Sequence, residues 1–117
     1  MEQTASIEQF REELQTWKHE LSSTKQEIRD FEKHLEQLST KKLPKDLLAQ
    51  VEHFQNLFIC QKEVIDRLRH DLPDSGYKVE NIFNNLRREG LDERMHTFRK
   101  IYIEIKQDFH QFDSDCM

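Results

Sequence analysis

Glycine and proline are scarce in this sequence of 117 residues, which contains two of each. A β-sheet needs many turns between its strands, and turns depend heavily on these two residues. Charged residues make up 35% of the chain, a share that suits the exposed faces of long helices. The scarcity of turn residues therefore favours an all-α fold over a fold that contains a sheet.

Cysteine is equally scarce. Cys60 and Cys116 lie far apart, and neither belongs to a CxxC pair or to a cluster with histidine. Disulfide frameworks and zinc sites both require closer cysteine spacings. We expect neither of them, and a reducing, cytoplasmic setting is the simplest expectation.

Long apolar runs are missing as well. No segment approaches the roughly 20 apolar residues that a membrane-spanning helix requires. Residues 1–6 are polar and contain no basic stretch before an apolar one, unlike a secretory signal. We therefore expect no membrane partner.

Sequence motifs for chemistry are also few. There is no glycine-rich phosphate loop, and no two of the six histidines are spaced three or four residues apart. Only Glu93 and His96 have the Glu-x-x-His spacing of helical-bundle metal sites, which need such ligands from more than one helix. We therefore expect no enzyme activity, no metal or other cofactor and no small-molecule ligand.

A heptad repeat of apolar residues between Ile7 and Leu38 is the strongest pattern that is present. Such a repeat predicts a long helix whose narrow apolar stripe faces a partner helix. Ser6, followed three residues later by Gln9, has the pattern of a capping box. The first helix is therefore predicted over residues 6–39.

Two further segments repeat the heptad pattern. One is predicted as a helix over residues 45–72, after a turn at 39–44 in which Pro44 supplies a first-turn residue. The other, over residues 77–112, changes phase at Gly90, with Asp92 as a possible cap, which predicts a kink or a break there. Together these segments predict a single domain over 1–117, an antiparallel three-helix bundle or coiled-coil hairpin.

The polar residues on the two seams support the hairpin. Antiparallel pairing across the turn places Thr24 beside Gln61, where a side-chain hydrogen bond can satisfy both. The same pairing brings Lys25 near Lys62, a mild repulsion. Pairing of the first helix with a second copy of itself is the alternative, because its Glu and Lys flanks are segregated and complement each other in a parallel pair.

The pattern Phe10, Leu14, Trp17 and Leu21 in the first of three helices resembles spectrin-type repeats in outline. The resemblance implies a three-helix coiled coil, and the break at Gly90 departs from it. We transfer neither residue roles nor partners from that family.

Candidate functional residues lie outside the seams. The net charge of -5 opposes general binding to phosphate backbones. Apolar residues at outer positions predict a further helix contact, and basic residues form two local spots; this candidate interaction surface comprises Ile59, Ile101, Ile103, Arg87, Arg88, Lys41, Lys42 and Lys45.

These observations favour a non-catalytic protein-protein interaction module, such as an adaptor, a scaffold or an assembly subunit. The expected partners are another protein, a second copy of the chain, or both. A regulatory nucleic-acid-associated protein that uses the basic spots is the alternative, and a metal-dependent helical-bundle enzyme is the third hypothesis.

Overall fold

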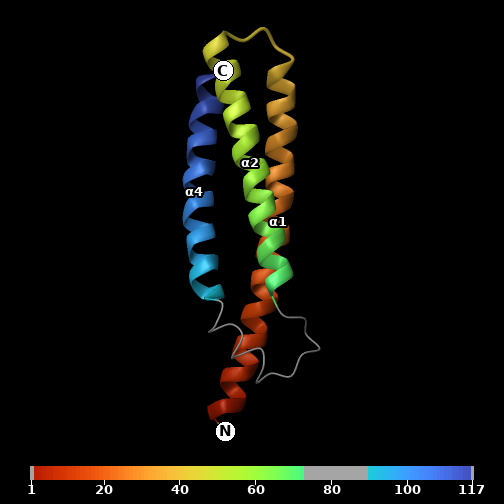
Figure 1. Cartoon of the computed structure of the whole chain (residues 1–117), viewed down its shortest axis with the longest axis vertical. Coiled ribbons are helices and arrows are strands. Elements are labelled where there is room, and N and C mark those ends of the chain that lie inside the picture. Colours follow the sequence, from red (N-terminus) through yellow and green to blue (C-terminus); the bar gives the residue numbers. More distant parts are fainter. Residues whose placement is uncertain (1, 73–89, 117) are drawn as a thin grey trace.

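The computed structural model describes residues 2–72 and 90–116, with side chains from Arg11 onward. It contains the helices α1 (Glu2–Ser39), α2 (Lys45–Asp71) and α4 (Leu91–Asp115), and no strand over these ranges. The helices run up, down and up in a rod of 63 × 20 × 20 Å (Figure 1). Helix α2 packs against both α1 and α4. The predicted all-α, three-helix architecture is confirmed.

Helix α1 begins at Glu2, four residues before the predicted start, and runs past the ends of α2 and α4 (Figure 1). The prediction that Ser6 caps this helix was wrong, because Ser6 lies within it and a capping residue has a non-helical backbone. Residues 2–5 contain neither Gly nor Pro. Extending a helix that is already formed through such residues costs little.

The connection from α1 to α2 is short. Pro44 has φ −56° and ψ 153°, and its carbonyl accepts hydrogen bonds of 3.0 Å from the backbone amides of Leu47 and Leu48. Pro44 thus stands directly before the helix and not within its first turn. The five residues between the two helices are enough to return the chain antiparallel to α1.

Gly90 stands directly before α4, with φ 60° and ψ 37°. This left-handed backbone cannot continue a right-handed helix, and glycine adopts it without the strain that a Cβ would add. The start of α4 at Leu91 matches the predicted break. Asp92 lies in the first turn and does not cap the helix, since no side chain hydrogen-bonds at this cap. Residues 77–89 of the predicted third helix lie outside the described residues.

The core follows the heptad positions and is rich in aromatic rings. Phe109 lies at its centre, 4.9 Å from Phe31, 5.6 Å from Phe54 and 5.4 Å from Phe58 between ring centroids. Trp17, on the same seam of α1, is also buried. Because these rings come from all three helices, they hold α4 against the α1–α2 hairpin.

The expected hydrogen bond between Thr24 and Gln61 is not formed. Gln61 is buried, and its Oε1 atom has no hydrogen-bond partner in the structure, whereas Thr24 is only partly buried. Gln61 lines the space between α2 and α4. In a bundle of three helices, a seam residue of α2 has two neighbouring helices to face, and Gln61 faces the second of them.

Candidate interaction surface

Three helix-helix interfaces run along the rod, and the side chains at their edges differ. At the α1/α2 edge, Lys25 binds Asp66 at 2.6 Å and Lys62 binds Glu32 at 2.9 Å. The hydrogen bond from Lys25 lowers the pKa of the Asp66 carboxyl. Each lysine thus pairs with an acid, so the expected repulsion between Lys25 and Lys62 is offset. This edge is crossed by ion pairs.

The α1/α4 edge carries a ladder of charged pairs between two parallel helices. Arg99 donates three hydrogen bonds of 2.7 to 3.1 Å to the two carboxylate oxygens of Glu20, and these bonds raise the pKa of its guanidinium. One heptad later Lys106 contacts Glu27 at 2.9 Å. A further heptad on, His34 of α1 contacts Asp113 of α4 at 2.6 Å. In this last pair the acidic residue belongs to α4, whereas in the first two pairs it belongs to α1.

The order of the charged residues along the two helices favours one register of α4 against α1. Sliding α4 by one heptad in one direction places Asp113 beside Glu27, and sliding it in the other direction places Asp92 beside Glu20. Either slip brings two carboxylates together, which is unfavourable. The ladder therefore acts with the core to align α1 and α4.

Tyr102 adds a polar contact beneath the ladder. Its buried hydroxyl donates a hydrogen bond to the Glu27 carboxylate. Burial and this hydrogen bond raise the pKa of Tyr102 well above its ordinary value. Burial raises the pKa of Glu27, but the hydrogen bonds from Tyr102 and Lys106 outweigh it and leave that pKa lowered. These groups satisfy one another and serve the structure of the bundle.

The α2/α4 edge is different. One ion pair, between Arg94 and Asp71 at 2.8 Å, crosses it close to the start of α4. Ile101 lies one heptad after Arg94 on α4, and Val64 lies one heptad before Asp71 on α2. Because α2 and α4 are antiparallel, Ile101 and Val64 face each other across the same edge. They are 42% and 37% exposed. An apolar pair thus occupies a position that charged groups fill at the other edges.

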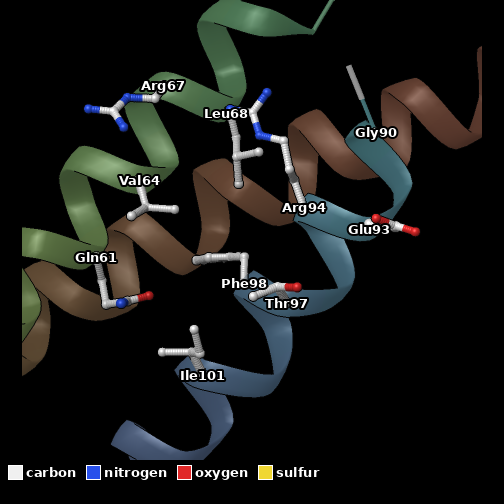
Figure 2. A pocket seen from close by; sticks show the side chains of 10 residues that line it. All are labelled: Gln61, Val64, Arg67, Leu68, Gly90, Glu93, Arg94, Thr97, Phe98 and Ile101. Atoms are coloured by element: carbon white, nitrogen blue, oxygen red, sulfur yellow. The ribbon is translucent and has the colours of Figure 1, made fainter. Parts of the chain in front are cut away.

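A groove of 460 Å³ opens at this α2/α4 edge, and Figure 2 shows the side chains of both helices around it. Its floor is apolar, formed by Leu68 and Phe98, and Val64 and Ile101 stand at its rim. Polar and charged groups complete the lining, namely Gln61, Arg67, Glu93, Arg94 and Thr97, with Gly90 at one end. We call this feature the α2/α4 groove.

Gln61 is the unusual member of the groove. Its side chain is 8% exposed, and Oε1 accepts no hydrogen bond. In Figure 2 its amide extends from α2 toward α4, among apolar neighbours. A buried acceptor without a partner costs about 1–3 kcal/mol. A residue of the groove lining thus carries a buried hydrogen-bond acceptor that the described residues leave unsatisfied.

The three predicted isoleucines do not form one surface. Ile59 lies seven residues from Asp66, which binds α1, and so stands beside the α1/α2 edge. Ile103 lies seven residues from His110, whose ring is 5.6 Å from Phe31 of α1, and so stands beside the α1/α4 edge. Ile101 alone of the three lines the α2/α4 groove.

The predicted basic residues are divided as well. Lys41, Lys42 and Lys45 are exposed at the turn between α1 and α2, whereas Arg87 and Arg88 lie outside the described residues. The turn is not uniformly positive, because the end of α4 brings Asp113 and Asp115 close to it. Both acids raise the pKa of Cys116, although less than burial does, while Lys41 lowers it. This mixture of signs weakens the field that a phosphate would meet.

Metal ligands and membrane-spanning helices are the remaining features to consider in the part of the chain that the structure describes. Within residues 11–72 and 90–116, no three His, Cys, Asp or Glu side chains gather as metal ligands would. Glu93 and His96 are both exposed. No helix in these ranges combines the length and apolar character needed to cross a membrane.

Sequence reasoning missed two residues of the groove. Val64 was not among the predicted outer apolar residues, and Gln61 was assigned to the interface with the first helix. The heptad positions of Val64 and Ile101 were the available signal. Val64 lies one heptad from Asp71 and Ile101 one heptad from Arg94, and the opposite charges of Asp71 and Arg94 indicate that these two helix faces meet. Recognising this requires knowing which edge of α2 faces α4.

Comparisons of the chain with protein-family models, with curated proteins and with solved structures found no match.

Proposed function

We propose that this chain is a non-catalytic protein-protein interaction module that binds an apolar helical surface in the α2/α4 groove. The observation that carries the proposal is the combination of an apolar rim with a buried, unpaired acceptor. Val64 and Ile101 are exposed at the rim, and Gln61 Oε1 lacks a partner beneath them. A docked helix can cover the first two, and it can donate a hydrogen bond to the third if docking turns the Gln61 amide so that its oxygen faces the groove.

The contrast with the other two edges supports this choice. Among the described side chains, at least two ion pairs cross each of the α1/α2 and α1/α4 edges, and a partner would have to displace charged groups along them, whereas the Arg94–Asp71 pair stands at one end of the α2/α4 edge. Displacing a charge pair without replacing it costs more than covering an aliphatic side chain. The α2/α4 groove is therefore the edge where an incoming apolar surface has the most to gain.

The proposal is tested by comparing two charge insertions at isoleucines of similar exposure. Proteins captured by the wild-type chain are identified, purified and titrated against wild type, Ile101→Glu and Ile103→Glu. We expect Ile101→Glu to weaken binding by roughly tenfold or more, as when a buried anchor becomes charged, and Ile103→Glu to leave binding unchanged. Equal binding by wild type and Ile101→Glu contradicts the proposal.

Both variants are first compared with the wild type by circular dichroism and urea unfolding. Ile101 and Ile103 are 42% and 53% exposed and both lie on α4, so neither substitution should unfold the bundle. Retained helicity ensures that any loss of binding reports on the groove.

A further inference from the structure

We propose that the occupant of the α2/α4 groove is a second copy of this chain, packed antiparallel about a two-fold axis that passes between the copies at the level of Val64 and Ile101. This inference rests on the proposed function and names the partner. In this arrangement α2 lies against α2 of the second copy, and α4 lies against α4. The rims of the two grooves, each with its Val64 and Ile101, cover one another at the axis.

The antiparallel arrangement supplies the donor that Gln61 lacks. On α2, Gln61 lies three residues before Val64 and Arg67 three residues after it, so the two-fold places Arg67 of one copy level with Gln61 of the other. Arg67 is exposed and lines the same groove. Its guanidinium has five N–H donors and is long enough to reach into the groove. With the Gln61 amide turned so that its oxygen faces the groove, two equivalent Arg67–Gln61 hydrogen bonds form in one dimer.

Helix α4 is complementary to itself in the same way. Arg94 lies seven residues before Ile101, and Asp108 lies seven residues after it. The two-fold therefore places Arg94 of one copy level with Asp108 of the other. Asp108 is exposed, while Arg94 binds Asp71 within its own copy and retains further donors on its guanidinium. Opposite charges meet at both ends of the α4 contact.

A two-fold axis parallel to the rod fits less well. It places α2 against α4 of the second copy, with residues at the same height facing each other. Because Val64 is level with Ile101, Gln61 then meets Glu104 of the second copy. A carboxylate accepts hydrogen bonds and cannot satisfy a second acceptor. The unpaired Oε1 atom therefore favours the antiparallel dimer.

The mass of the chain in solution tests the dimer. Sedimentation equilibrium is measured on wild type, Ile101→Glu and the matched control Ile103→Glu over a wide concentration range. We expect wild type and Ile103→Glu to form a dimer, and Ile101→Glu to raise the dissociation constant by roughly tenfold or more. A wild type that stays monomeric at its highest soluble concentration overturns the inference, and so does a dimer that Ile101→Glu leaves unchanged.

Oxidative trapping tests the direction of packing. In a background in which Cys60 and Cys116 are Ser, Val64→Cys places a thiol at the proposed axis, close to its equivalent in the second copy. We expect Val64→Cys to form a covalent dimer under mild oxidation, and Ile103→Cys, on another edge, to stay monomeric under the same conditions. Equal trapping of the two variants contradicts the antiparallel arrangement.

A double-mutant cycle tests the hydrogen bond to Gln61. Arg67→Met removes the donor and should weaken dimerisation by roughly tenfold, the effect of losing a hydrogen bond from a charged group. In a Gln61→Leu background, where no acceptor remains, the same change should have little effect. Additive effects of the two substitutions exclude the contact.

These outcomes separate the two proposals. A monomeric wild type whose binding to another protein is weakened by Ile101→Glu overturns the second copy as occupant and leaves the interaction module intact. If Ile101→Glu changes neither the binding of another protein nor self-association, both proposals are contradicted.

Discussion

Replacing Gln61 with leucine should stabilise the bundle, although glutamine is the residue that the chain carries. The side chain is 8% exposed, and Oε1 has no hydrogen-bond partner. The apolar residues that line the same groove include Leu68 of α2 and Phe98 and Ile101 of α4. Leucine is close to glutamine in size and brings no polar atom into this apolar setting, so the substitution removes a cost and leaves no large cavity.

The size of the effect follows from the unpaired acceptor. An unsatisfied buried polar group costs about 1–3 kcal/mol. Gln61 borders a groove, and its side chain can turn partly toward water in solution, which reduces the cost of the unpaired acceptor. We therefore expect a gain of about 1–2 kcal/mol in the free energy of unfolding. For a domain of this size, each kcal/mol corresponds to roughly 4 °C in Tm. The expected rise in Tm is therefore roughly 4–8 °C.

Urea unfolding monitored by circular dichroism measures this change. The experiment is performed at low protein concentration, where self-association does not contribute. The midpoint should rise while the slope of the unfolding free energy against urea stays constant, which marks a change in stability alone. Gln50→Leu on the exposed surface of the same helix is the matched control and should change stability by less than about 0.5 kcal/mol.

A neutral or destabilising Gln61→Leu would refute the reasoning. Either result would mean that the amide is satisfied in solution and that the groove offers no unpaired acceptor. The Arg67 contact of the proposed dimer would then lose its main support. The Val64 and Ile101 rim is tested independently by the charge insertion at Ile101.

Three further predictions concern the bundle itself. Phe109→Ala should cost about 3–5 kcal/mol, because it removes a buried ring that contacts three others, whereas Ile103→Ala should change the unfolding midpoint in urea very little. Gly90→Ala should cost about 1 kcal/mol in the same assay, since a Cβ finds open space there but strains the left-handed backbone; an unchanged midpoint would mean that this conformation is not kept. Tyr102→Phe should cost about 1 kcal/mol at pH 7 through the lost hydrogen bond to Glu27. Because the folded-state pKa of Glu27 is lowered from its ordinary value of 4.5, this contribution is present above that value and is lost as the pH falls through the folded-state pKa. A difference between wild type and Tyr102→Phe that does not shrink as the pH is lowered below 4.5, over the range in which both proteins stay folded, would exclude the hydrogen bond to the ionised Glu27 carboxylate as its cause.

The sequence was a good guide to the fold because heptad spacing is a local property. The helices over 2–39, 45–71 and 91–115 carry the predicted seams, and the break at Gly90 coincides with a change of phase. Helix ends were predicted less well, as the start at Glu2 illustrates. Capping preferences of about 1 kcal/mol are small beside the tendency of a long helix to extend through residues that permit it.

The candidate site was predicted only in part. Ile101, Ile59 and Ile103 were grouped as outer apolar residues, and all three are exposed, but Ile59 and Ile103 stand at other edges than Ile101. Gln61 was expected to bond Thr24, and it lines the α2/α4 groove without a partner. Both errors concern which neighbour a helix face meets.

The sequence by itself determined that the chain is helical, where its apolar stripes lie, and that Gly90 interrupts them, because these features depend on residues a few positions apart. Only the tertiary structure decided which edge of α2 faces α1 and which faces α4. That choice depends on contacts between residues distant in the chain, among them Phe31 with Phe109 and Glu20 with Arg99. The same contacts leave Val64 and Ile101 exposed together at the α2/α4 edge, where we propose that a partner binds.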